Sequence, residues 1–178
     1  MTSPTAMTSP TAPTSERDDL LAALDQHRHL LLRTVQGLTD AQIRLTPTVS
    51  QLCLGGIIKH VALMEEGWVR FIAQGPAYEG PPDEGTYDAH AAGFRLVDGE
   101  SLDVLGRRYA EVARRTDEFV ADIPSLDLSH PLPEAPWFEA GARWTARRVL
   151  VHIVAETAQH AGHADIIREA IDGSKSMG

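Results

Sequence analysis

The sequence has few of the features that mark several common classes of protein. Only one of its 178 residues is a cysteine, Cys53, so no disulfide can form within the chain. No apolar run resembles a signal peptide or reaches the length of a membrane span. The 16 basic residues are outnumbered by 25 acidic ones, and a net charge of -9 argues against a surface that follows nucleic-acid phosphates. These absences favour a soluble, cytoplasmic protein.

The first residues differ in composition from the rest of the chain. The stretch MTSPTAMTSPTAPT repeats MTSPTA in tandem and offers almost nothing that a core could bury. Such a composition is typical of disorder, so we expect residues 1–14 to be a disordered tail. Residues 15–178 are long enough for one globular domain.

Four segments have apolar residues at every third or fourth position, which predicts four long helices. We expect these helices over about 15–38, 54–73, 101–123 and 149–173, and no convincing strand competes with them. Ser15 and Asp18 have the spacing of a capping box at the start of the first helix. Two long connections, about 75–100 and 124–143, separate the last three helices. The predicted fold class is therefore all-α, a four-helix bundle with two long connecting loops.

The fourth predicted helix carries polar residues where apolar ones are expected. Its apolar positions follow a spacing of three or four that, continued through the middle of the helix, falls on Glu156 and His160. An unpaired carboxylate buried there would cost several kcal/mol. A carboxylate and an imidazole four residues apart can instead bind one metal ion. The pattern predicts either a metal site or a buried hydrogen-bond network without an ion.

A third ligand is available on the second helix, where His60 is the histidine nearest to an inner face. His60, Glu156 and His160 would form a set of two imidazoles and one carboxylate with open positions, as catalytic sites do. A set of His60, His160 and His163 is the alternative. Glu156 and His163 do not easily share an ion, because seven residues rise about 10.5 Å along a helix. We prefer Glu156 as the ligand, with His163 as a hydrogen-bond partner of a ligand.

Other side chains are candidates for the wall of a pocket above this site, although each is also suited to packing. They are Trp68, Trp137, Phe138 and Trp144, with His90 and His130 as polar contacts. Four arginines could contact an acidic substrate, although solvation at the surface is the preferred interpretation: Arg70, Arg143, Arg147 and Arg148. Cys53 is expected to be a small buried hydrophobe rather than a catalytic group.

Three stretches of the sequence resemble the DinB-like superfamily of bacterial four-helix bundles, in particular its branch of small uncharacterised proteins. They are LTDAQIRLTP, LGGIIKHVALMEEGW and RWTARRVLVHIVAETAQHAGHADIIREAIDG. The resemblance implies a divalent cation, zinc or nickel in many members, held by the residues that match here as His60, Glu156 and His160. The glutamate is similar to that of mycothiol-dependent maleylpyruvate isomerase. Activities of the superfamily imply transfers or isomerisations with a small thiol such as mycothiol or bacillithiol.

We therefore expect a metal-dependent thiol S-transferase or isomerase, in which the ion stabilises a cosubstrate thiolate for attack on an electrophile. One alternative is a metal-dependent hydrolase, with His163 as a possible base. Another is a non-catalytic stress protein that binds a metal or ligand. The expected partners are a small-molecule electrophile and a small thiol, with neither nucleic acid nor membrane. A homodimer is also expected, because Trp137 and Trp144 bracket more apolar surface than a lone bundle needs.

Overall fold

The computed structural model describes residues 15–76, 85, 88 and 91–176, so the expected tail over 1–14 lies outside the described residues. The long helices are α1 (Glu16–Arg33), α2 (Leu54–Gln74), α4 (Leu102–Asp122) and α5 (Ala146–Asp172), and a short 3-10 helix, η1, spans Gln42–Arg44. The predicted all-α four-helix bundle is confirmed. Within the described part of the chain, none of the helices combines the length and the apolar character that crossing a membrane requires.

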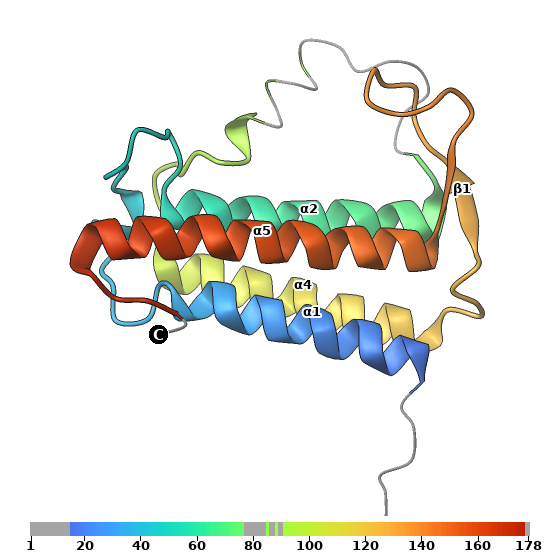
Figure 1. Ribbon diagram of the computed structural model, residues 1–178, viewed down its shortest axis with the longest axis horizontal. Helices are drawn as coiled ribbons and strands as arrows, with labels where there is room; N and C mark the ends of the chain where they lie inside the picture. The colour runs from blue at the N-terminus through green and yellow to red at the C-terminus, as the bar shows by residue number, and fades with distance from the viewer. Residues whose placement is uncertain (1–14, 77–84, 86–87, 89–90, 177–178) are drawn as a thin grey trace, which may run out of the picture.

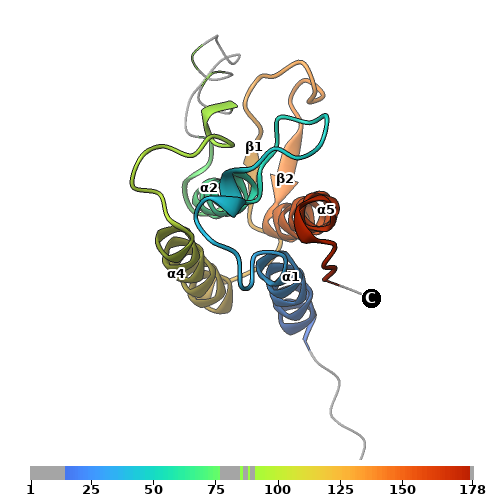
Figure 2. The ribbon, with the colours of Figure 1, turned by 90° about the vertical axis from the view of Figure 1, so that its left-hand side faces the viewer.

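The four helices pack side by side in two pairs. Helix α5 packs against α1 and α2, and α2 packs against α4. Figures 1 and 2 show that α1 and α5 run in one direction and that α2 and α4 run in the other. Because α2 and α4 point the same way, the chain between them has to return along the length of the bundle. This topology explains why the connection after α2 is longer than neighbouring helices of a simple up-and-down bundle require.

Helix α1 begins as predicted and ends earlier than predicted. Its capping box is confirmed: the Asp18 amide donates to Ser15 Oγ, and the Ser15 amide donates to the Asp18 carboxylate, both at 3.2 Å. The helix ends at Arg33 rather than near Leu38. The Thr34 hydroxyl and amide both bind the Leu31 carbonyl, at 2.7 and 3.1 Å, so the backbone tightens before it turns. Leu38 is nevertheless buried, and this burial accounts for the apolar pattern that suggested a longer helix.

A two-stranded antiparallel sheet lies between α4 and α5, although the sequence suggested no strand. Strands β1 (Ser129–Pro131) and β2 (Arg143–Thr145) pair with Ser129 opposite Thr145. Three residues are too few to show an alternating pattern, so the prediction missed these strands. His130 fixes the hairpin to the end of α2, because its Nε2 lies 3.1 Å from the Ile72 carbonyl oxygen.

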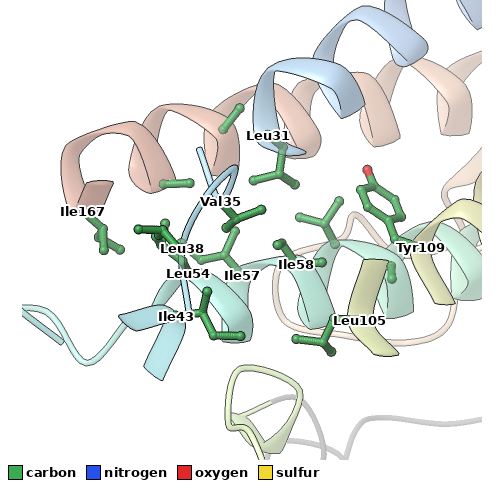
Figure 3. Packing of buried hydrophobic residues seen from close by; sticks show 14 of the residues in the cluster. Leu31, Val35, Leu38, Ile43, Leu54, Ile57, Ile58, Leu105, Tyr109 and Ile167 are labelled. Atoms are coloured by element: carbon green, nitrogen blue, oxygen red, sulfur yellow. The ribbon is translucent and has the colours of Figure 1, made fainter. Parts of the chain in front are cut away.

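The core consists of two apolar clusters along the bundle axis. One lies around Leu31, Ile57 and Tyr109, as Figure 3 shows, and the other surrounds Leu24 and Ile153. Burial of these side chains supplies the main free energy that holds the helices together. The helices therefore form a fixed frame for the side chains between α2 and α5.

The frame also contains a buried ion pair, which the sequence analysis missed. The Glu65 side chain has no exposed surface and that of Arg28 is 4% exposed. Arg28 Nε donates to Glu65 Oε2 at 3.2 Å, and Arg28 Nη1 donates to Asp117 Oδ1 at 2.9 Å. Charged residues are rarely buried without a partner, so the sequence alone did not indicate that Glu65 lies in the core. Its partner, Arg28, is on another helix.

Candidate metal centre

Helices α2 and α5 bring together the three predicted ligands. His60 lies on α2, and Glu156 and His160 lie one turn apart on α5. One potential ligand atom from each residue lies within 4.8 Å of those of the other two. His160 Nε2 and Glu156 Oε2 are 3.7 Å apart. Two residues distant in sequence from His60 thus reach it because α2 and α5 are direct neighbours.

The burial of this trio differs from the prediction for Glu156. His60 and His160 are both 7% exposed, but the Glu156 side chain is 30% exposed. The fully buried position of the α5 seam is Thr157, whose hydroxyl donates to the Ile153 carbonyl at 2.8 Å. The prediction that Glu156 lies deep in the seam is wrong, because Thr157 can satisfy its own hydroxyl within the helix. Glu156 instead stands at the edge of the site, where it connects the two buried imidazoles to solvent.

The three side chains fit a divalent cation of the zinc or nickel type. Nitrogen and carboxylate ligands bind such ions at about 2.0–2.2 Å, so ligand atoms of a tetrahedral site are about 3.4 Å apart. His160 Nε2 and Glu156 Oε2 are 3.7 Å apart, close to this value, and one potential ligand atom of each of the three residues lies within 4.8 Å of those of the other two. Two imidazoles and one carboxylate also leave positions for further ligands. The trio thus has suitable donors, gathered closely enough to share one ion.

His163 lies on the opposite side of His160 from Glu156. The Nδ1 atoms of His160 and His163 are 3.5 Å apart, whereas His160 Nε2 faces Glu156. The two ring nitrogens of His160 therefore have different neighbours. This is the arrangement in which a partner on one nitrogen fixes the orientation of a ligand that binds through the other. The only group of potential ligands found in the described residues comprises His60, Glu156 and His160, without His163.

Phe94, from the connection between α2 and α4, covers the imidazole of His60. The two rings stack with centroids 3.7 Å apart and planes inclined by 16°. The sequence analysis did not single out this residue, because residues 91–101 lack the periodicity that reveals helices. Its only signal in the sequence is a single aromatic side chain in a stretch rich in glycine and polar residues.

Three of the side chains predicted for a pocket wall, Trp68, Phe138 and Trp144, form one connected group of rings. The rings of Trp68 and Trp144 stack with centroids 5.0 Å apart, and Phe138 meets Trp144 edge to face at 5.6 Å. His152, one turn before Glu156 on α5, contacts Trp68 and Trp144 at 4.9 and 5.1 Å. The sequence analysis assigned no role to His152. Trp68, Phe138, Trp144 and His152 thus form an aromatic cluster. This cluster lies next to the trio, because His152 is one turn from Glu156 on α5.

Burial changes the protonation of His152. The pKa of its imidazole is lowered below the usual value, chiefly because the ring is partly removed from water. The carboxylate of Glu156 opposes this effect, and Arg148 adds to it. The neutral imidazole, which can both donate and accept a hydrogen bond, is therefore favoured at this position.

The other three wall candidates differ in what the structure describes of them. Trp137 is 60% exposed and meets Phe138 at a centroid distance of 6.1 Å. His130 sits at the end of α2, against Phe71 and the Ile72 carbonyl. His90 lies outside the described residues. Of the two described residues, Trp137 adjoins the aromatic cluster through Phe138.

The four arginines considered as substrate contacts have different surroundings. Arg147 forms ion pairs with Glu16 and Asp127. Arg143 donates to the Ser129 carbonyl at 2.7 Å, which supports the hairpin. The Arg148 guanidinium lies 5.2 Å from the ring centre of Trp144, at the outer edge of the aromatic cluster. Arg70 is exposed on α2.

Two hollows in the described surface lie outside the trio. One of about 470 Å³ lies within the loop of residues 132–141 and shares Phe138 with the aromatic cluster. The other, of about 200 Å³, lies between α2 and α4 and includes Arg70 and Arg115. Neither includes a predicted ligand, so the exposed part of Glu156 is the described route from the trio to solvent.

The fold and the trio define a DinB-like four-helix bundle with a candidate metal centre between its second and last long helices. The chain belongs to the mycothiol-S-transferase family, because the model of that family matches residues 19–173. The matched range includes α2, α4, α5, all of α1 except its first three residues, and the three predicted ligands. The resemblance to the DinB-like superfamily is thereby confirmed.

Two solved structures are similar in fold. YfiT from Bacillus subtilis, described as a probable metal-dependent hydrolase with an unusual four-helix bundle topology, is 14% identical with a TM-score of 0.65. The match covers 94% of this chain and 95% of that one. A conserved protein from Enterococcus faecalis is 16% identical with a TM-score of 0.64, over 91% of this chain and 100% of that one. Among curated proteins, no sequence matches the chain.

Proposed function

We propose that the protein is a metal-dependent S-transferase that uses a small thiol such as mycothiol. The observation that carries the proposal is the convergence of His60, Glu156 and His160 in a chain of the mycothiol-S-transferase family. The donor set resembles that of catalytic sites because it leaves coordination positions open. A divalent ion held by the trio, zinc or nickel, lowers the pKa of a thiol and makes the thiolate available at neutral pH.

The protein's own residues hold and orient this centre. His60 and His160 supply imidazoles from buried positions, and Glu156 supplies a carboxylate at the exposed edge. His163 is placed to fix the ring of His160 through Nδ1, which leaves Nε2 for the ion. Because the buried side is filled by the bundle core, the thiol enters beside Glu156.

In the proposed reaction the chain supplies no nucleophile. The thiolate sulfur of the cosubstrate attacks an electrophilic carbon, a carbon–sulfur bond forms, and the bond to the leaving group breaks with its electron pair. With a haloarene the leaving group is halide, and the thiol proton goes to solvent. Cys53 does not take this part, because its side chain is buried and its sulfur caps α2 by accepting from the Gly56 amide at 3.4 Å.

The aromatic cluster is the proposed contact for the electrophile. Trp68 of α2, Trp144 of β2 and His152 of α5 are half-buried, and their flat rings contact one another, with His152 one turn before Glu156. Flat, weakly hydrated surfaces favour planar or apolar groups over small, strongly hydrated ones. His152 adds a neutral hydrogen-bonding group to this otherwise apolar wall.

The test is thiol consumption by the purified chain after a chelator has removed its metal and zinc or nickel has been restored. A chlorodinitroarene and an epoxide serve as electrophiles, and halide release is measured alongside loss of thiol. Wild type loaded with metal is expected to form the thioether, whereas His60→Ala and Glu156→Ala are expected to lose both bound metal and activity. His29→Ala is the matched control, because His29 is an exposed histidine on α1, outside the trio.

The same experiment separates the alternatives. Product formed from water without thiol would replace the transferase with a hydrolase. Bound metal with no turnover of any electrophile would leave a metal-binding protein. Metal retained in Glu156→Ala and lost in His163→Ala would reverse the ligand assignment in favour of His163.

A further inference from the structure

We infer that Phe94 is a positioning residue for the metal centre: it holds the plane of the His60 imidazole and closes one side of the site. The inference rests on the proposed function, since it assumes that His60 is a ligand. Phe94 belongs to neither of the helices that carry the ligands, and it reaches His60 from the connection that precedes α4.

The ring geometry makes Phe94 suited to this task. Its ring covers one face of His60 at a centroid distance of 3.7 Å, and it meets His160 at 5.6 Å with an inclination of 51°. A metal ion binds an imidazole in the plane of the ring, along the nitrogen lone pair. A stack on the face of the ring therefore restricts its rotation without obstructing the nitrogen that would bind the ion.

Two consecutive glycines of α2, Gly55 and Gly56, allow the backbone near Phe94 to pack closely against this helix. A Cβ on Gly56 would lie 2.0 Å from the Phe94 carbonyl oxygen, closer than any real contact. A Cβ on Gly55 would lie 2.6 Å from Leu96 Cδ1. Only the absence of these side chains allows the segment to approach the helix closely enough for Phe94 to reach His60, one turn further along.

Polar contacts hold the same segment from its other end. Lys59, the residue before His60, donates from Nζ to the Arg95 carbonyl at 2.9 Å and pairs with Glu100 at 2.9 Å. Arg44 donates to the Glu100 carbonyl at 2.8 Å. The Lys59 and Glu100 side chains are 12% and 17% exposed, so this pair is more sheltered from solvent than a typical surface pair. The segment that begins at Phe94 is therefore attached to α2 both by close packing and by polar contacts.

Closure on this side leaves the Glu156 side for ligands. The faces of His60 and His160 that meet Phe94 are unavailable to a substrate, whereas the Glu156 side chain is 30% exposed. His152 lies one turn from Glu156 along α5, and its ring contacts that of Trp68 on α2. Phe94 would thus determine from which side a thiol can approach an ion bound by the trio.

The test measures metal binding directly, with Co²⁺ as a spectroscopic probe and a competing chelator to obtain its affinity. Phe94→Ala is expected to weaken Co²⁺ binding by about tenfold or more and to change the absorption spectrum of the bound ion. Phe94→Leu keeps an apolar cover but lacks a flat ring, so the same changes in smaller degree are expected. Gly56→Ala leaves the ring intact but displaces it, and should also weaken binding. Val97→Ala, in the same segment with a side chain 58% exposed, is the control expected to match wild type.

Unchanged affinity and an unchanged Co²⁺ spectrum in Phe94→Ala, with a helical circular dichroism signal equal to wild type, would overturn the inference. Loss of affinity only in Phe94→Ala, with Phe94→Leu equal to wild type in both readouts, would also overturn it, because bulk rather than stacking would then suffice. The proposed function can fail separately: if the Phe94 variants weaken Co²⁺ binding and metal-loaded wild type consumes no thiol, the positioning role stands without the transferase.

Discussion

The Glu65 carboxylate has no exposed surface, and its charge is neutralised by one residue of another helix, Arg28. Replacement by Gln keeps the shape of the side chain and removes the negative charge. We expect Glu65→Gln to lower the free energy of unfolding by about 3 kcal/mol, because the Arg28 charge would remain buried. Asp117, which also accepts from Arg28, is half exposed and compensates only in part. Urea denaturation monitored by circular dichroism measures the change.

The double variant Arg28→Met with Glu65→Leu is the control for this interpretation. It removes both charges and keeps an apolar volume, so it should be more stable than Glu65→Gln. If the single and double variants unfold at the same urea concentration, the loss in the single variant does not come from an unpaired charge.

His152 should contribute to the acid sensitivity of the metal-free protein. Because burial lowers its pKa in the folded state, the unfolded chain binds the extra proton more readily. Stability from this residue is therefore complete above the unfolded pKa, about 6.5, and is lost as the pH falls through that value towards the folded pKa. We expect His152→Gln to lose less stability than wild type between pH 7 and pH 5, measured as the urea midpoint with chelator present. His29→Gln, an exposed control, should keep the wild-type pH dependence.

At the scale of residues, sequence reasoning found the three candidate ligands, His60 on another helix among them, but missed Phe94 and the Arg28–Glu65 pair. Glu156 and His160 were found because a spacing of four places them on one side of α5. Phe94 and the Arg28–Glu65 pair were missed because their partners are 34 and 37 residues away in the chain, at positions that no local pattern connects. The depth of Glu156 was misjudged because Thr157 can occupy the seam while bonding to its own helix.

At the scale of elements, the glycines of the helices separate into two kinds. A Cβ on Gly106 of α4 would meet no atom within 4 Å, whereas a Cβ on Gly56 of α2 would collide with the Phe94 carbonyl. Gly106→Ala is expected to stabilise the protein by about 0.5–1 kcal/mol, because alanine loses less backbone freedom on folding. Gly56→Ala is expected to destabilise it despite the same gain in helix propensity. Thermal or urea unfolding measures the change in stability of each variant. Equal changes of the same sign in Gly106→Ala and Gly56→Ala would contradict this distinction.

The four long helices could be predicted because each is long enough to repeat its apolar spacing several times. Strands β1 and β2 could not be predicted, since three residues show no alternation. Their pairing also depends on α4 ending, and α5 beginning, at the same end of the bundle. The end of α1 was placed too late because Val35 and Leu38 are buried after the helix has ended. Burial pattern indicates the side of the chain that faces the core, and hydrogen bonds determine where a helix stops.

At the scale of the whole molecule, we expect two copies of the chain to associate. Trp137, 60% exposed, and Val151, 43% exposed, are large apolar side chains on the described surface near the α5 end that carries the hairpin. Such side chains are unfavourable in water and are commonly covered by a partner. Light scattering at micromolar concentration should give twice the chain mass of 19.4 kDa, and Trp137→Ser should shift the equilibrium towards the monomer. A single species of 19.4 kDa would rule the dimer out.

The place of α5 at the end of the chain has a consequence for how the protein is made. During synthesis α1 leaves the ribosome first, yet its main packing partner is α5, the last helix to emerge. The same helix carries two of the three predicted ligands, so His60 on α2 lacks both of its partners until α5 has been synthesised. A nascent chain that stops before α5 has neither the surface that covers α1 nor a complete set of donors. A divalent ion that needs all three residues can therefore be held only once α5 has been made, and we expect a chain truncated before α5 to bind no such ion at this site.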